Sequence, residues 1–218
     1  MKILHVISSV HPKYGGPIEG VKQLGSVFRG LGISVEICSV DDPNADCVVN
    51  SIIKVHALGP PFLGYWYSPR VIPWLRAHRH EYDAVIVNGL WQHSGFAVWR
   101  ALAGTNTPYF VFTHGMLDPW FKHAYPLKHL KKWLYWPWGE YRVLRDARKV
   151  IFTCERERQL ARESFWLYKA NEAVTSYGVS NPPVNERQLT SIFFCTISTA
   201  SKQAYCVISK SHSPKKGL

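Results

Sequence analysis

The run KILHVISSV at residues 2–10 opens the sequence, followed by the loop HPKYGGPIEG at 11–20 and the segment VKQLGSVFRGLG at 21–32. The first run is nearly all apolar and rich in β-branched residues, which is typical of a strand buried in a parallel sheet. In the third segment, apolar residues recur at helical spacing up to Gly32, which favours a helix that stops there. The order strand, glycine loop, helix therefore predicts an α/β fold.

The same alternation continues along the chain. Helical patterns separate further apolar runs that predict buried strands: ISVEICSV (33–40), IIKVHAL (52–58), DAVIVNG (83–89), PYFVFTHG (108–115), KVIFTCE (149–155) and, last, EAVTSYGV (172–179). Because the strands alternate with helices, we expect a doubly wound parallel sheet of the Rossmann-like kind.

The composition is that of one globular domain followed by a tail. Of 218 residues, 46% are hydrophobic and 19% charged, which supplies a core and excludes disordered and fibrous classes. After Gly178 the pattern changes, and residues 181–218 hold nine Ser or Thr and a single acid. We predict a domain over 1–180, and over 181–218 a linker with an incomplete or disordered start of a second domain.

Targeting and cysteine signals favour the cytoplasm. No apolar run approaches the ~18 residues that a membrane-spanning helix needs. The short apolar stretch after Met1-Lys2 lacks the features of a signal peptide. Five cysteines without a CxxC motif make a disulfide scaffold or zinc ribbon improbable.

The chain is strongly basic, with 26 Lys and Arg against 15 Asp and Glu, a net charge of +11. Such a surface suits nucleic acid, anionic lipid headgroups or a phosphorylated substrate. The sequence contains no RNA-binding motif, so nucleic acid is the least favoured of these partners.

Three loops follow predicted strands and hold candidate site residues. They contain Gly15 and Gly16, then Trp91 and His93 in NGLWQH, then His114 in THGMLD. Since the carboxyl ends of parallel strands meet at one edge, we expect the loops to converge there. Two glycines before a helix let a bound anion approach the backbone, and a histidine in a cleft can bond a sugar hydroxyl. The alternatives are a plain tight turn and structural histidines.

Several other chemistries lack their motifs. GxGxxG is absent, and no acid occupies a clear ribose-binding position, which disfavours a nicotinamide site. HExxH, GxSxG and Walker A sequences are also absent, so metalloprotease, hydrolase and nucleotide-phosphatase functions are disfavoured. We expect no metal site.

Residues 120–149 interleave Trp and Tyr with lysines. This pattern suits a membrane interface, and the alternative is that the aromatics face the core while the lysines are solvated. Within 127–149, Pro137 predicts a break into two helices. The residues expected to line one face are Leu127, Leu130, Leu134, Tyr141 and Leu144.

KILHVISSVHPKYGGPIEGVKQLG, NGLWQH and above all FTHGMLDPW resemble the N-terminal half of retaining glycosyltransferases of the GT-B fold, family 4 type. The resemblance runs from Met1 to about Tyr177. Bacterial members that build surface polysaccharide are the most similar. In that family two Rossmann-like domains face each other, the first holding mainly the acceptor and the second most of the nucleotide-sugar donor.

The resemblance implies roles for particular residues. His114 would be the catalytic cleft histidine, with Gly115 and Met116 beside it. Gly15 and Gly16 would lie against the donor phosphates or the transferred sugar. Trp91 and His93 would shape the acceptor side, and Glu155 would face the cleft.

The implied reaction is transfer of a sugar, with retention and without a metal or other cofactor, from a nucleotide-diphosphate sugar to a glycan or lipid-linked acceptor. The implied location is the cytoplasm, peripheral at the inner face of the cell membrane through residues 120–149. The family's donor-binding acids have no counterpart here, so 218 residues alone are expected to be inactive. The alternative is a truncated, non-catalytic remnant or a carbohydrate-binding module.

Overall fold

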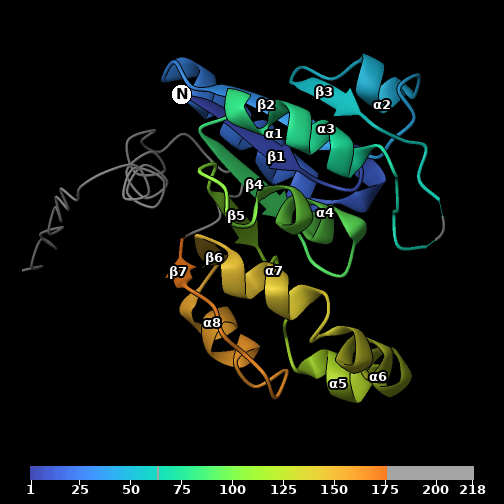
Figure 1. Cartoon of the computed structure of the whole chain (residues 1–218), viewed down its shortest axis with the longest axis vertical. Coiled ribbons are helices and arrows are strands. Elements are labelled where there is room, and N and C mark those ends of the chain that lie inside the picture. Colours follow the sequence, from blue (N-terminus) through green and yellow to red (C-terminus); the bar gives the residue numbers. More distant parts are fainter. Residues whose placement is uncertain (63, 176–218) are drawn as a thin grey trace, which may run out of the picture.

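The computed structural model describes residues 1–62 and 64–175, and these form one seven-stranded parallel sheet. The order in the sheet is β3-β2-β1-β4-β5-β6-β7, with all neighbours parallel (Figure 1). The strands are β1 (Lys2–Val6), β2 (Ser34–Ser39), β3 (Lys54–Ala57), β4 (Ala84–Asn88), β5 (Tyr109–Phe112), β6 (Lys149–Phe152) and β7 (Glu172–Val174). The predicted doubly wound, Rossmann-like sheet is confirmed.

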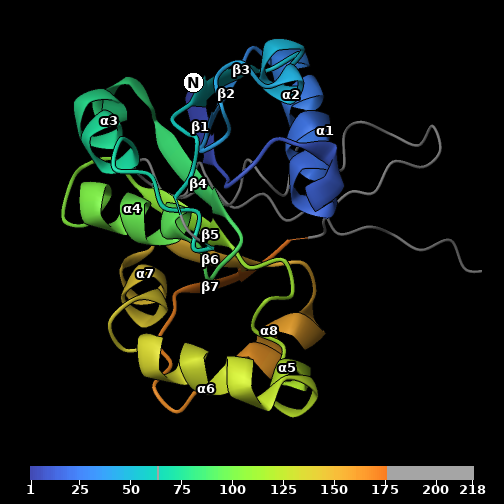
Figure 2. The ribbon, with the colours of Figure 1, turned by 90° about the vertical axis from the view of Figure 1, so that its right-hand side faces the viewer.

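Helices cover both faces of this sheet, with α1 on one side and α3, α4 and α7 on the other (Figure 2). The helices are α1 (Gly16–Gly30), α2 (Asp46–Val49), α3 (Val71–His78), α4 (His93–Leu102), α5 (Trp120–Ala124), α6 (Pro126–Tyr135), α7 (Glu140–Asp146) and α8 (Glu155–Ala161). Short 3-10 helices span Pro12–Tyr14 and Arg79–Glu81. The sequence patterns did not predict α2 or α5.

Alternate residues of β4 belong to two different hydrophobic clusters, one on each face of the sheet. Val85 and Val87 of β4 pack with α3, α4 and α7, whereas Ala84 and Ile86 pack with Phe28 of α1. All five residues of β4 are buried because it is a central strand with helices on both sides. The near-continuous apolar runs in the sequence follow from this double burial.

The predicted break at Pro137 is confirmed, since α6 ends at Tyr135 and α7 begins at Glu140. The predicted common face is wrong. Leu144 is buried, but Leu127, Leu130 and Leu134 of α6 are exposed. The predicted pattern treated two helices as one continuous face, and the turn between them rotates α6 so that its leucines point away from the core.

The tryptophans of this region also depart from a core role. Trp136 is fully buried, while Trp120, Trp133 and Trp138 are exposed. The alternative in which these aromatics face the core therefore holds for Trp136 alone among the four.

Three further predictions concern membrane spans, the cysteines and the tail. Within them, no helix is long and apolar enough to span a membrane. The cysteines described there (Cys38, Cys47 and Cys154) are free thiols. The predicted tail, 181–218, lies outside the described residues.

Candidate functional site

The loops after β1, β4 and β5 meet at one edge of the sheet, as predicted. Ser8 Oγ, just after β1, donates to Gln92 Oε1 at 2.6 Å. Trp91 Nε1 donates to the carbonyl of Met116 at 3.1 Å, which joins the loop after β4 to the loop after β5. The structure therefore brings the Trp91 and His114 loops together and ties both to the first loop.

His114 sits in an unusual backbone conformation at the centre of this edge. Its φ is +49°, a left-handed value that non-glycine residues seldom adopt and that is often found at functional sites. The imidazole stacks on Phe112, with ring centroids 4.6 Å apart. Burial lowers the pKa of His114 to about 4, so the ring is neutral at physiological pH.

Asn88, at the end of β4, lies between this ring and His5. Its Nδ2 is 3.3 Å from the carbonyl oxygen of Ile86 and 3.2 Å from His5 Nδ1. Its Oδ1 is 3.4 Å from His114 Nε2. Asn88, which was not among the predicted site residues, therefore contacts both histidines.

Glu157 of α8 is hydrogen-bonded to the loop that carries His114. Its carboxylate accepts hydrogen bonds from Thr113 Oγ1 (2.5 Å), Gly115 N (2.7 Å), Thr153 N (2.7 Å) and Thr153 Oγ1 (2.6 Å). Burial opposes ionisation, yet these bonds lower the pKa of Glu157. A single carboxylate therefore connects the ends of β5 and β6.

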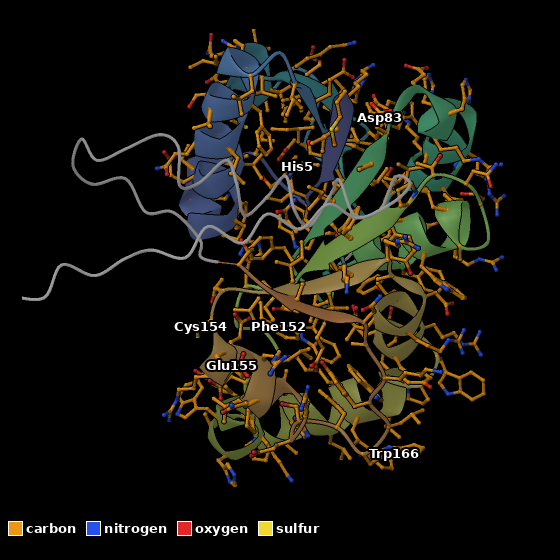
Figure 3. The ribbon with its side chains drawn as sticks, turned by 90° about the vertical axis from the view of Figure 1, so that its left-hand side faces the viewer. His5, Asp83, Phe152, Cys154, Glu155 and Trp166 are labelled. Carbon is orange, nitrogen blue, oxygen red and sulfur yellow. The ribbon has the colours of Figure 1, made fainter. Side chains whose placement is uncertain are left out.

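Glu157 was not among the residues predicted from the sequence, which named Glu155 of the same helix instead. Glu155 opens α8 next to Cys154 (Figure 3) and pairs with Arg158 of its own helix. A signal for Glu157 was present, because the neighbouring strands β5 and β6 both end in Phe and are followed directly by Thr. The two threonine hydroxyls meet at one carboxylate, and only the fold shows which glutamate supplies it.

Trp91 is also held by a buried carboxylate. Its φ is +65°, and its backbone N–H donates to Glu140 Oε1 at 2.6 Å. Burial raises the pKa of Glu140 to about 8, although the hydrogen bond from Trp91 and the charge of Lys132 act in the opposite direction. The Trp91 ring packs on Trp136 and Phe165, and Lys132 Nζ lies 4.5 Å from its centroid.

His93 lies deeper than a cleft residue would. It is 2% exposed, begins α4, and packs edge-on against Tyr67 (4.7 Å between centroids) and Tyr65 (6.1 Å). Burial lowers its pKa. The position of His93 supports the Tyr65–Tyr67 segment next to the Trp91 loop and does not expose the ring to a substrate.

Gly15 and Gly16 lead into α1 at the same sheet edge. Gly15 has a φ of +76°, which requires glycine, and no atom lies within 4 Å of where a Cβ on either glycine would stand. Met116 packs beneath Gly89, with its Sδ accepting from Leu90 N at 3.1 Å. The glycine loop thus leaves space in front of the helix N-terminus, while Met116 serves as a support.

Among the described residues, no three His, Cys, Asp or Glu side chains group in a way that could hold a metal ion.

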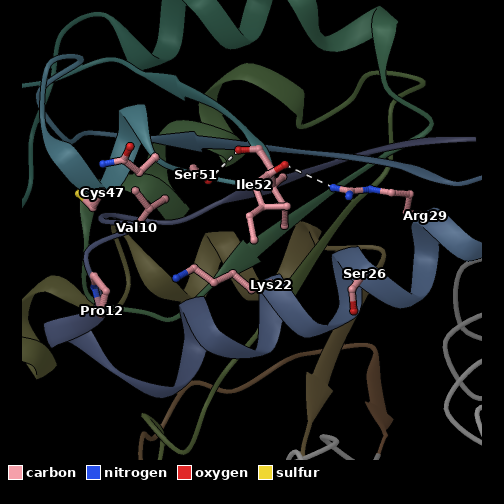
Figure 4. Close-up of a pocket in the computed structure, with 10 residues that line it drawn as sticks. Val10, Pro12, Lys22, Ser26, Arg29, Cys47, Ser51 and Ile52 are labelled. Atoms are coloured by element: carbon pink, nitrogen blue, oxygen red, sulfur yellow. Dashed lines mark hydrogen bonds between the residues drawn. The ribbon is translucent and has the colours of Figure 1, made fainter.

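A pocket of about 310 Å³ lies between α1 and residues 47–53, with Lys22 and Ser26 on one wall (Figure 4). It opens beside the glycine loop at Pro12 and is separate from the His114 loop.

Comparisons with known proteins agree with this arrangement. A family described as "Glycosyl transferase 4-like domain" matches residues 15–178. No curated protein sequence matches the chain. Sucrose-phosphate synthase from Thermosynechococcus elongatus is similar in structure, with a TM-score of 0.62 and 19% identity over 80% of this chain and 47% of that one.

A glycosyltransferase from Rickettsia africae is similar at a TM-score of 0.52, with 16% identity over 82% of this chain and 43% of that one. At these identities the likeness shows the fold. The chain spans about half the length of the two enzymes.

Proposed function

The chain belongs to the glycosyl transferase 4-like domain family and has the fold of an N-terminal GT-B domain, and we propose that it forms the acceptor-side half of a retaining glycosyltransferase. The reaction would move a sugar from a nucleotide-diphosphate sugar to a glycan or lipid-linked acceptor, in surface polysaccharide biosynthesis. The observation that carries the proposal is the neutral, left-handed His114 held between Asn88 and Glu157 at the edge where three loops meet.

A neutral histidine suits this chemistry. Glycosyl transfer passes through an oxocarbenium-like state, in which positive charge develops on the sugar ring. An imidazolium beside that ring would oppose the charge, whereas a neutral imidazole can bond a sugar hydroxyl without electrostatic cost. The pKa of His114, lowered by burial to about 4, keeps the ring in the neutral form.

The glycine loop would serve the donor. With no Cβ in the space before α1, a phosphate or the transferred sugar can approach the backbone N–H groups at the helix N-terminus. Negative charge developing on the leaving phosphate would be stabilised there without a metal or other cofactor. Trp91, held by Glu140, would form a wall of the acceptor side.

We place the reaction in the cytoplasm, at the inner face of the cell membrane. A lipid-linked acceptor lies in that membrane, and residues 119–139 carry four lysines and no acid. Such a stretch is attracted to anionic headgroups.

The test is an assay of a complete two-domain form, in which a donor domain follows this chain, with a panel of nucleotide-diphosphate sugars and a membrane lipid extract, followed by mass spectrometry and determination of the product anomer. We expect a glycosylated product of retained configuration, unaffected by EDTA and lost in His114→Ala. Glu81→Ala, a change at an exposed residue that precedes β4 and so lies at the opposite end of the sheet from the three loops, is the matched control and should leave turnover unchanged.

A second outcome would favour the carbohydrate-binding or remnant alternative. This is binding of glycans in calorimetric titration, weakened by His114→Ala, without turnover and without binding of UDP or UDP-glucose. The chain spans only about half of its structural relatives, which is the observation that keeps this alternative. Absence of both glycan and nucleotide-sugar binding would contradict either role.

A further inference from the structure

Helix α6 is amphipathic, and it is turned so that its apolar side faces outward. Leu127, Leu130 and Leu134, spaced three and four residues apart, are 78%, 55% and 62% exposed. Residues at this spacing share one face of a helix. In a globular domain such a face normally packs on the core, so this orientation calls for a partner.

The opposite side of α6 holds polar groups, and these attach the helix to the domain. Tyr135 Oη bonds to Tyr65 Oη, and Lys132 Nζ lies 4.5 Å from the centroid of the Trp91 ring. His129 stacks on Phe165, with 5.1 Å between centroids. Because these contacts lie on the inner side, the outward direction of the leucines follows from the packing of α6.

Aromatic side chains from neighbouring segments widen the exposed apolar surface. Trp133 of α6 lies 6.3 Å from Trp166 between ring centroids, and α5 runs beside α6 in Figures 1 and 2. Trp166 is labelled next to α6 in Figure 3. We call this surface the α6 face, and its exposed members are Leu127, Leu130, Trp133, Leu134 and Trp166.

The charges carried by α6 and its neighbouring residues have one sign. Residues 119–139 contain Lys122, Lys128, Lys131 and Lys132 and no acid. Glu163 lines the groove beside α6 together with Arg162, so it is offset by a neighbouring cation. An apolar strip with tryptophans and lysines around it matches a membrane surface, where leucines enter the acyl boundary, tryptophans sit at headgroup level and lysines meet phosphates.

We propose that the α6 face binds the surface of a bilayer that contains anionic lipids, with α6 lying in the plane of the interface. A second copy of the chain is a poorer occupant, since it would bring the same lysines together and since interface cores are depleted of lysine. The proposal deepens the proposed function by naming the place of the acceptor, and the binding itself does not depend on glycosyl transfer.

A groove lies beside this face. It has a volume of about 920 Å³ and runs between α6 and residues 162–166, with Trp133, Trp166, Lys122 and His129 among its walls. Ser164, another lining residue, donates through Oγ to the carbonyl of Leu117, three residues after His114. One wall of the groove is therefore bonded to the segment that follows His114.

The experiment is co-sedimentation of the full chain with vesicles of neutral phosphatidylcholine, or with about 30% phosphatidylglycerol added, at about 0.05 M and about 0.5 M salt. We expect binding to the anionic vesicles that weakens at high salt. The triple variant L127Q/L130Q/L134Q should bind roughly tenfold or more weakly. K128Q/K131Q should lose roughly tenfold or more on anionic vesicles at low salt.

Matched controls separate the α6 face from general stickiness. Val49 and Ile52, exposed on the other side of the molecule, give the control V49Q/I52Q, which should bind like the wild type. Circular dichroism should show the triple variant folded, because the three leucines make no core contact. Equal binding of the triple variant and the wild type would overturn the proposal.

Two other results would also overturn it. One is failure of the wild type to bind anionic vesicles. The other is a dimer in solution that the triple variant dissociates, which would assign the α6 face to a second copy. His114→Ala should bind vesicles normally, so loss of transfer in that variant with intact vesicle binding distinguishes failure of the site from failure of the membrane surface.

Discussion

Helices α4 and α6 are both ten residues long, but only α4 buries its apolar side. Both carry apolar residues along one side. In α4 that side packs on the sheet and seven residues are buried, including Ala97, Val98 and Leu102. In α6 no residue is buried, and the leucines face outward. The same periodicity therefore serves a core in one helix and an outer surface in the other.

The difference comes from what each helix lies against. Helix α4 follows β4 directly and returns along the sheet, so its apolar residues meet the strand side chains of the larger core. Helix α6 follows α5 and packs on the Trp91 loop and Phe165. Lys132 lies over the Trp91 ring, and His129 stacks on Phe165. Polar groups make the inner contacts, and the leucines are left outside.

The sharpest test of this contrast places one charge on each apolar side. Val98→Asp should cost more than about 4 kcal/mol of unfolding free energy, because an unpaired carboxylate would be buried against the sheet. Leu130→Asp should change it by less than about 0.5 kcal/mol. Urea denaturation of both variants measures the difference. Similar losses in the two would contradict the orientation of α6.

As the pH falls, we expect the sheet to lose stability before the packing of α6 changes. His5 of β1 is fully buried, and burial lowers its pKa to about 4 from an ordinary value of 6.5. The neutral ring stabilises the fold above pH 6.5, and this contribution of about 3 kcal/mol is lost as the pH falls through 4. Urea titration at pH 7 and pH 4 should show the loss, and His5→Gln should reduce it. An equal loss in that variant would remove His5 as its cause.

Glu157→Gln tests the anchor that holds the loop between the sheet and α5. The amide has one acceptor oxygen in place of two, so about half of the four hydrogen bonds are lost, at a cost of about 2 kcal/mol. We also expect His114 to lose its left-handed conformation, which NMR of the imidazole would detect. Glu155→Gln is the matched control on the same helix. An unchanged His114 signal in Glu157→Gln would show that Glu157 does not position the ring.

The effect of Glu140→Gln on stability should depend on pH. The folded carboxyl has a pKa raised to about 8 by burial, so it keeps a proton that the unfolded chain loses near 4.5. Its contribution to stability therefore falls as the pH rises from 4.5 to 8. The neutral amide lacks this penalty, so the stability of the variant relative to the wild type should rise by several kcal/mol, about 4 at most, between pH 4.5 and pH 8. A difference that does not change with pH would contradict a protonated Glu140.

Much of the site could be predicted because it lies on strand ends. The runs before Asn88 and Thr113 are apolar enough to identify buried strands, and parallel strands place the loops that follow at one edge. The prediction that the Trp91 and His114 loops converge is confirmed by the bond from Trp91 to Met116. The supporting residues escaped notice, since Glu140 and Glu157 act across distances of 42 to 49 positions along the chain.

By itself the sequence determined the parallel sheet, the positions of the loops and the break at Pro137, because strand burial, glycine and proline act through local chemistry. Only the tertiary structure decided which glutamate holds each loop, that His93 is enclosed by tyrosines, and that the leucines of α6 face outward. Periodicity shows that a helix has an apolar side. Which way that side points depends on neighbours that are distant in the chain.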